Sequence, residues 1–85
     1  MNYKVLLFYK YVKIKEPHEE MIRQRAWCEA LGLTGRIIVA DEGINGTLEG
    51  TKKNTEKYIE LMNGERKFKN INWNISDGTG KSFKK

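Results

Sequence analysis

The stretch from 35 to 47 constrains the fold of this chain more than any other part of the sequence. It begins with a β-branched run at 37–39, which favours a buried strand because branching at Cβ stiffens χ1 and packs well on a pleated surface. The run enters a short acidic turn, and the chain then leaves through Asn45 and Gly46 into a second strand-like segment. Gly43 and Gly46 allow backbone angles that other residues avoid. The stretch therefore predicts a β-hairpin whose tip presents carboxylates, backbone amides and the side chain of Asn45.

Apolar patterns predict one strand and one helix before the hairpin. The segment 3–12 is apolar on both alternating faces at its centre, which is typical of a strand inside a sheet. Pro17 favours the start of a helix, and Gly32 favours its end because glycine readily adopts the left-handed conformation after the last turn. The apolar face expected for this helix comprises Met21, Trp27, Cys28 and Leu31.

A second helix and a last strand are expected after the hairpin. Thr51 is a candidate N-cap for the helix, which should end at Asn63-Gly64. The segment 71–75 alternates strictly between apolar and polar residues, as a half-buried strand does, so Trp73 should face the helices. With hairpin strands at 36–40 and 46–50, the order is strand, helix, strand, strand, helix, strand. This order predicts an α+β fold, the ferredoxin-like βαββαβ sandwich, with a four-stranded antiparallel sheet and two helices on one face.

Length, cysteine content and charge limit the possible functions. A chain of 85 residues suffices for one domain, which we expect at 1–76, followed by a basic tail at 77–85. The apolar run at 5–9 is too short for a signal peptide or a membrane span, so we expect a cytoplasmic protein without membrane contact. Cys28 stands alone, which excludes a disulfide framework and a zinc site. The net charge of +5 suits a polyanion such as nucleic acid, and a solubilising surface explains it equally well.

Three kinds of site lack the residues that they need. Gly80-Lys81-Ser82 copies the end of a phosphate-binding loop without the earlier glycine. Acylphosphatase, a small enzyme with this fold, requires a glycine-rich loop with an arginine after the first strand and an asparagine on the second. Here the loop is 12–15, without either residue, and Val39 occupies the asparagine position. An RNA-recognition motif carries aromatic residues on its third strand, and 46–50 has none, although Phe8 and Tyr9 on the first strand remain available to a partner.

The hairpin holds the residues best suited to catalysis or ligand binding. Asp41 and Glu42 could divide acid and base roles or hold a metal, but neighbours in sequence point apart, so a capped turn is favoured. Arg36 begins a strand that is otherwise apolar, where its guanidinium could pair with either carboxylate across the hairpin or bind a phosphate. The side chain of Asn45 can bind backbone, a base or a ribose. We predict no catalytic residue and no metal site in this chain.

Several segments together resemble one family. They are Leu6-Leu7-Phe8-Tyr9-Lys10-Tyr11-Val12, Trp27-Cys28, Leu31-Gly32-Leu33, Gly35-Arg36-Ile37-Ile38-Val39-Ala40, Glu42-Gly43-Ile44-Asn45-Gly46-Thr47 and Phe83-Lys84. With these segments the chain resembles the N-terminal domain of the bacterial tRNA wobble-uridine hydroxylases, also called rhodanese-domain proteins. In that family a ferredoxin-like domain precedes a rhodanese-like domain, whose loop cysteine carries an oxygen-dependent 5-hydroxylation of uridine at the tRNA wobble position.

The resemblance implies a non-catalytic part of a tRNA-modifying enzyme, because Cys28 lies on a helix and is not the loop cysteine. We expect no cofactor in this domain. The expected partners are tRNA, bound through the full-length protein, and a rhodanese-like domain in the same chain. The residues expected to bind tRNA or to complete the active-site cleft are Lys10, Arg36, Glu42, Gly43, Asn45, Gly46 and Thr47. The alternative is a standalone protein-interaction module without RNA contact.

Overall fold

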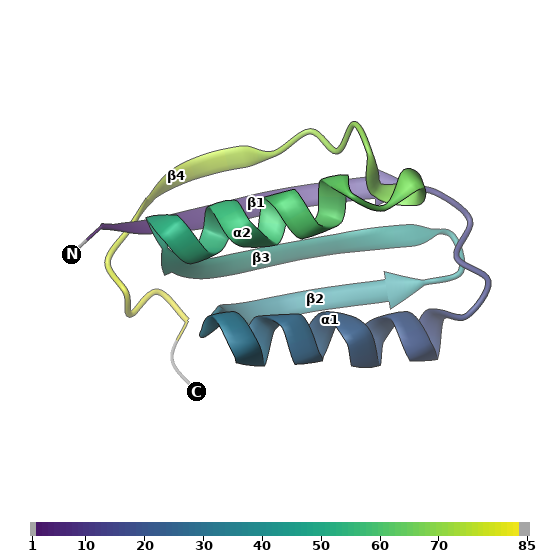
Figure 1. The fold of residues 1–85 in the computed structure, drawn as a ribbon, viewed down its shortest axis with the longest axis horizontal. Helices are drawn as coiled ribbons and strands as arrows, with labels where there is room; N and C mark the ends of the chain where they lie inside the picture. Colours follow the sequence, from purple (N-terminus) through teal and green to yellow (C-terminus); the bar gives the residue numbers. More distant parts are fainter. Residues whose placement is uncertain (1, 84–85) are drawn as a thin grey trace.

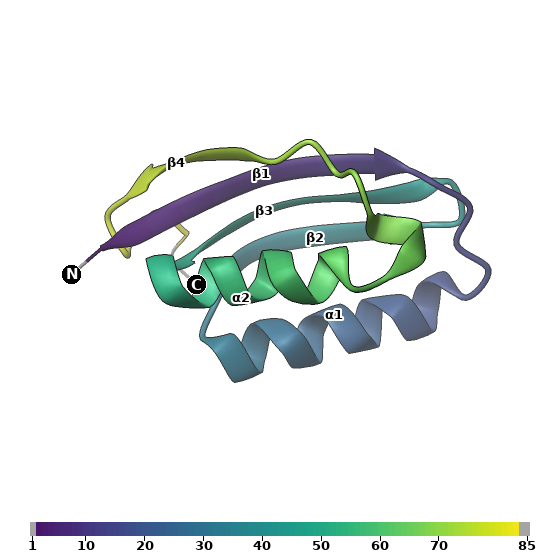
Figure 2. The same ribbon diagram turned by 45° about the horizontal axis from the view of Figure 1, so that its top comes forward.

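The computed structural model describes residues 2–83 and has the expected α+β architecture (Figure 1). Its elements are β1 (Tyr3–Tyr11), α1 (Pro17–Leu31), β2 (Thr34–Ala40), β3 (Gly43–Thr51), α2 (Lys52–Asn63), the 3-10 turn η1 (Arg66–Phe68) and β4 (Asn74–Gly78). The strands form an antiparallel sheet in the order β2-β3-β1-β4. Both helices lie on one side of this sheet (Figure 2). The predicted ferredoxin-like fold is confirmed, with β1 inside the sheet as its apolar centre indicated.

The helix ends follow the local signals in the sequence. Pro17 occupies the first turn of α1, and Gly32 follows its last turn in the left-handed conformation with a φ of 66°. Thr51 caps α2 as predicted, because its Oγ1 accepts a hydrogen bond from the backbone N–H of Asn54 at 3.1 Å. The helix α2 ends just before Gly64.

The predicted apolar residues Trp27, Cys28 and Leu31 of α1 pack against the core, but the helix also buries polar side chains that the sequence did not indicate. Glu20 and Gln24 are buried, and Gln24 Oε1 accepts a hydrogen bond of 2.6 Å from the hydroxyl of Tyr58 on α2. Gln24 also donates to Glu20, which pairs with Arg23 and Lys67. Buried polar groups are tolerated because each finds a partner. Arg23 and Gln24 are local partners of Glu20 within α1, whereas Tyr58 and Lys67 come from distant parts of the chain. The predicted apolar residues are only half-buried: Met21, Trp27, Cys28 and Leu31.

The last strand begins later than predicted. Only 74–78 form β4, and Trp73 precedes it, packing its ring 4.7 Å from Phe8 and 6.0 Å from Tyr58 between ring centroids. Trp73 therefore faces the helices as expected, while Ile75 is half exposed at the sheet edge. Since β4 reaches Gly78, the sheet passes the boundary expected at 76. The division into 1–76 and 77–85 stays a prediction, and positions 84 and 85 lie outside the described residues.

The helices cover only one of the two faces of the sheet. The inner face carries the core beneath the helices: Leu6, Phe8, Ile14, Leu33, Ile44, Leu48, Tyr58, Met62, Phe68 and Ile71. On the outer face, which no helix covers, Leu7, Tyr9, Tyr11 and Ile38 are exposed. The expectation that 37–39 form a buried strand is thus wrong in part, because β2 lies at the sheet edge and Ile38 points outward.

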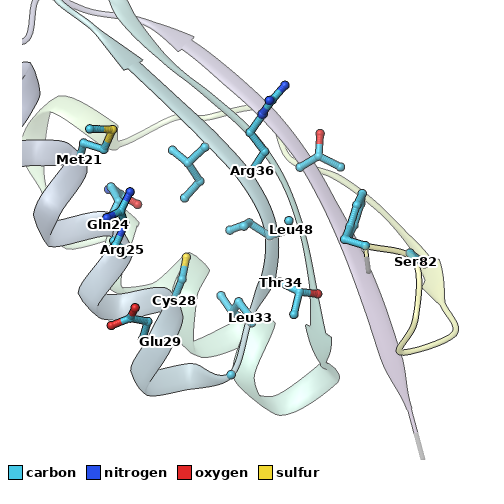
Figure 3. A pocket seen from close by; sticks show the side chains of 15 residues that line it. Met21, Gln24, Arg25, Cys28, Glu29, Leu33, Thr34, Arg36, Leu48 and Ser82 are labelled. Carbon is cyan, nitrogen blue, oxygen red and sulfur yellow. The ribbon is translucent and has the colours of Figure 1, made fainter. Parts of the chain in front are cut away.

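Residues 79–83, here called the strap, turn back from the end of β4 over the outer face. The strap passes the ring of Tyr3, since a Cβ added at Gly80 would lie 2.9 Å from that ring. It then reaches Glu49 on β3. Figure 3 shows Ser82 on the side of the strands that faces away from α1. The strap therefore covers the end of the outer face at which β1 begins.

Glu49 anchors the strap. Its carboxylate accepts hydrogen bonds from the backbone N–H groups of Thr79, Gly80 and Ser82 at 2.9, 3.1 and 2.9 Å. The hydroxyl of Ser82 donates a fourth hydrogen bond at 2.8 Å. Burial of Glu49 opposes its ionisation, but the hydrogen bonds from the strap outweigh this effect and lower the pKa of the carboxyl. A sheet carboxylate that is only 2% exposed is thereby fully satisfied.

Candidate functional site

The strand register arranges the outer face in rows, because residues paired across antiparallel strands share a face. One row runs Arg36, Thr47, Leu7 and Asn74, and the next runs Ile38, Asn45 and Tyr9. A third row joins Ala40, Gly43 and Tyr11. We call these three rows the open half of the outer face. The covered half comprises the rows through Tyr3 and Val5, which lie at the end occupied by the strap.

The tip of the hairpin is shorter than predicted. Only Asp41 and Glu42 form the turn, whereas Asn45 and Gly46 already belong to β3. The carbonyls of Asp41 and Glu42 accept hydrogen bonds from the backbone of the segment after β1, at 2.9 and 3.2 Å. Their side chains are exposed. The turn is therefore fixed through its backbone carbonyls.

The two glycines of the hairpin serve different purposes. Gly43 has a positive φ of 158°, and a Cβ there would collide with the backbone of Lys10. Gly46 has no positive φ, contrary to our expectation of special backbone freedom. A Cβ at Gly46 would lie 2.7 Å from the ring of Phe8, so glycine is required there for space.

The register separates the seven candidate residues. It brings Arg36, Asn45 and Thr47 together in adjacent rows of the open half. Lys10 and Gly46 occupy positions of the opposite face, since their partners Ile44 and Phe8 point into the core. The remaining two, Glu42 and Gly43, lie at the hairpin end of the open half.

Arg36 is the cation of the open half. It pairs across the sheet with Thr47, not with the turn, and its side chain is exposed and extends away from α1 (Figure 3). Within residues 2–83, the ion pairs join other side chains, and Arg36 has no carboxylate partner. The alternative in which Arg36 pairs with Asp41 or Glu42 is not seen among these residues, which leaves the guanidinium available to an external anion.

A small hollow lies beside β1, where β4 stops. Because β4 pairs only with the first part of β1, up to Leu7, the rest of β1 has no paired strand on that side within residues 2–83. The hollow has a volume of about 300 Å³. Its lining residues are Leu7, Phe8, Tyr9, Asn72, Trp73 and Asn74. The sequence analysis missed Asn72 and Asn74 as candidates, although their polar positions in the alternating segment were the available signal.

A wider hollow of about 1040 Å³ follows the edge of β2 and is lined by α1 and the strap (Figure 3). Cys28 lies against it. Burial, with a smaller contribution from Glu29, raises the pKa of the Cys28 thiol to about 11, so the sulfur stays protonated at neutral pH. Across residues 2–83, no three potential ligands gather as a metal site needs, and neither helix has the length and apolar content to cross a membrane.

Comparison with known proteins agrees with the resemblance drawn from the sequence. The family model described as the UPF0176 acylphosphatase-like domain matches residues 3–85. The tRNA uridine(34) hydroxylases of Staphylococcus aureus strains Newman and JH9 are each 47% identical over 85 residues. The match covers all of this chain and 27% of each relative, so the chain spans about a quarter of their length.

Proposed function

We propose a function that proceeds from one established point: the chain belongs to the family of UPF0176 acylphosphatase-like domains. Its relatives are tRNA uridine(34) hydroxylases, and it corresponds to their N-terminal domain. In our proposal this domain performs no chemistry itself. It binds tRNA with the open half of its sheet and so positions the substrate for a catalytic domain of the rhodanese type in the same polypeptide.

The observation that carries the proposal is the uncompensated guanidinium of Arg36 beside Asn45 and Thr47. A guanidinium binds phosphate through two parallel hydrogen bonds, and amides and hydroxyls bind ribose and base edges. Among residues 2–83, the three rows of the open half contain no acidic side chain, and the carboxylates nearest to them are those of the turn. Glu49, in the covered half, is buried under the strap. Arginine, amide and hydroxyl groups in adjacent rows suit a single RNA segment.

The sequence supports a non-catalytic role for the domain. The loop 12–15 and Val39 replace the residues that an acylphosphatase uses, although the family description shares that name. We therefore expect the chain to hydrolyse neither acyl phosphates nor thiosulfate.

A tRNA-binding titration of the 85-residue chain at two salt concentrations tests the proposal. Each phosphate contact contributes to the slope of log K against log salt, so Arg36→Ala should weaken binding severalfold and reduce that slope by about 1. Arg25→Ala on α1 is a matched control, since Arg25 is exposed on the helical side. Equal loss in both variants would mean that overall charge, not the open half, attracts RNA.

A protein-interaction module is the second candidate, and the exposure of Leu7 and Ile38 (48% and 49%) favours it. An apolar docking surface would make binding insensitive to salt. Absence of tRNA binding at low salt, with Arg36 intact, would select this alternative.

A further inference from the structure

We infer that the hollow beside Tyr9 binds an unpaired nucleobase of RNA. This inference rests on the proposed function and adds to it the part of the RNA that the domain recognises. It assigns a role to three residues outside the candidate set: Tyr9, Asn72 and Asn74.

Tyr9 supplies the stacking surface. The sequence leaves Phe8 and Tyr9 equal as candidates, but the structure separates them: Phe8 is 3% exposed in the core, whereas Tyr9 is 62% exposed. The ring of Tyr11 meets that of Tyr9 edge-on, with 5.8 Å between centroids, and braces it on the hairpin side. Bases unstacked from an RNA helix are commonly held on such exposed aromatic rings.

Asn72 and Asn74 flank the same hollow and are both exposed. A carboxamide carries donors and an acceptor, which is the combination needed to pair with the edge of a base. Trp73 lies between them, and its buried Nε1 donor has no partner within residues 2–83. The hollow therefore combines an aromatic wall with two exposed carboxamides.

The hollow lies close enough to Arg36 for one short RNA segment to contact both. Arg36 lies two strands and one row away from Tyr9. With strands spaced about 4.8 Å apart and same-face residues about 6.8 Å apart along a strand, the two Cα atoms are separated by about 12 Å. Arg36 can thus hold a phosphate of the same short RNA segment whose base stacks on Tyr9.

The hollow selects single-stranded RNA. Stacking on the exposed ring of Tyr9 requires a base with a free face, which a base has only when it has left its helix. Bases within a duplex are covered above and below by their neighbours and expose only their edges. A loop nucleotide, such as one of a tRNA anticodon loop, satisfies this requirement.

Binding of an anticodon stem–loop RNA and of a fully paired RNA of equal length to the 85-residue chain tests the inference. The stem–loop should bind more tightly, and Tyr9→Ala should weaken its binding about tenfold, whereas Tyr9→Phe should stay within about twofold. The double variant Asn72→Ala/Asn74→Ala should reduce the preference for the loop over the duplex. Ile22→Ala, an exposed apolar position on α1, is the control.

The outcomes separate this inference from the proposed function. If Arg36→Ala weakens binding while Tyr9→Ala does not, or if duplex and loop bind equally, the base site is refuted and RNA binding by the domain stands. If neither variant affects binding, both proposals fail. Circular dichroism spectra and melting curves of each variant establish that the folded domain was measured.

Discussion

The two halves of the outer sheet face show how the same strands can be closed in one place and open in another. In the covered half, the carboxylate of Glu49 is buried and accepts four hydrogen bonds from the strap. In the open half, Arg36 is exposed without an ion pair among the described residues, and Tyr9 and Ile38 remain uncovered. Polar groups that the fold satisfies stabilise it, whereas polar groups that it leaves unsatisfied are available to a ligand. The comparison therefore predicts stability effects in one half and binding effects in the other.

The largest stability effect should come from the covered half. Glu49→Ala removes the acceptor of four hydrogen bonds, including three from the strap backbone, and should lower the free energy of unfolding by about 2–3 kcal/mol. Urea denaturation measures the loss. Thr47 is the neighbouring residue of β3 on the same outer face. Thr47→Ala is therefore the matched control and should lower the free energy of unfolding much less. Equal losses in the two variants would contradict the distinction between the halves.

Acid should weaken the same anchor. Because the folded-state pKa of Glu49 lies below its ordinary value of 4.5, its contribution is complete above that value and is lost as pH falls through the folded pKa. The stability advantage of the parent over Glu49→Gln should therefore shrink below about pH 4.5. Glu20 also has a lowered pKa, so both proteins lose stability in acid, and only the difference between them reports on Glu49. A difference that stays constant from pH 6 to pH 3 would mean that the strap does not depend on the charge.

Substitutions at polar positions of the open half should leave folding almost unchanged. Arg36→Ala and Asn45→Ala remove exposed side chains and should each change the free energy of unfolding by no more than about 0.5 kcal/mol. Urea denaturation again gives the measurement, beside tRNA titrations in which both variants bind more weakly. A loss of 2 kcal/mol or more, about that expected at Glu49, would show that the open half is structural.

The smallest effect is expected at the turn. The side chain of Glu42 is exposed, and the turn is held by a backbone hydrogen bond that does not involve this side chain. Glu42→Ala should leave stability unaltered and change tRNA affinity by less than about twofold, since it removes only one screened surface charge. A marked fall in affinity would move the binding site from the open half to the hairpin tip.

The sequence predicted the order of elements and the helix ends, because these depend on neighbouring residues: Pro17, Gly32 and Thr51 act within one turn of their own position. It could not predict which face of β1 would stay open, since Phe8 and Tyr9 are both aromatic and alternate. Phe8 is covered because Tyr58 of α2 and Trp73 pack against it, and both contacts are distant in sequence.

Contacts between residues far apart in sequence also made the burial of two carboxylates impossible to predict. Glu49 in a strand and Glu20 in a helix have the appearance of solvated surface residues. The partners of Glu49 lie in the strap, and one partner of Glu20, Lys67, lies on η1. For the same reason, only part of the candidate site was predicted. The hairpin supplied Arg36, Asn45 and Thr47, while Asn72 and Asn74 reach Tyr9 only through the end of β4.

The link between Glu49 and the strap also bears on the order in which the molecule assembles. The hairpin of β2 and β3 joins residues close in sequence, whereas the hydrogen bonds of Glu49 span 30 to 33 positions. During synthesis, the carboxylate must stay hydrated until residue 82 has emerged, because burying it earlier would leave a charge without donors. The strap should therefore be the last part to close, and a nascent chain ending before it should expose Glu49 and the start of β1 to water.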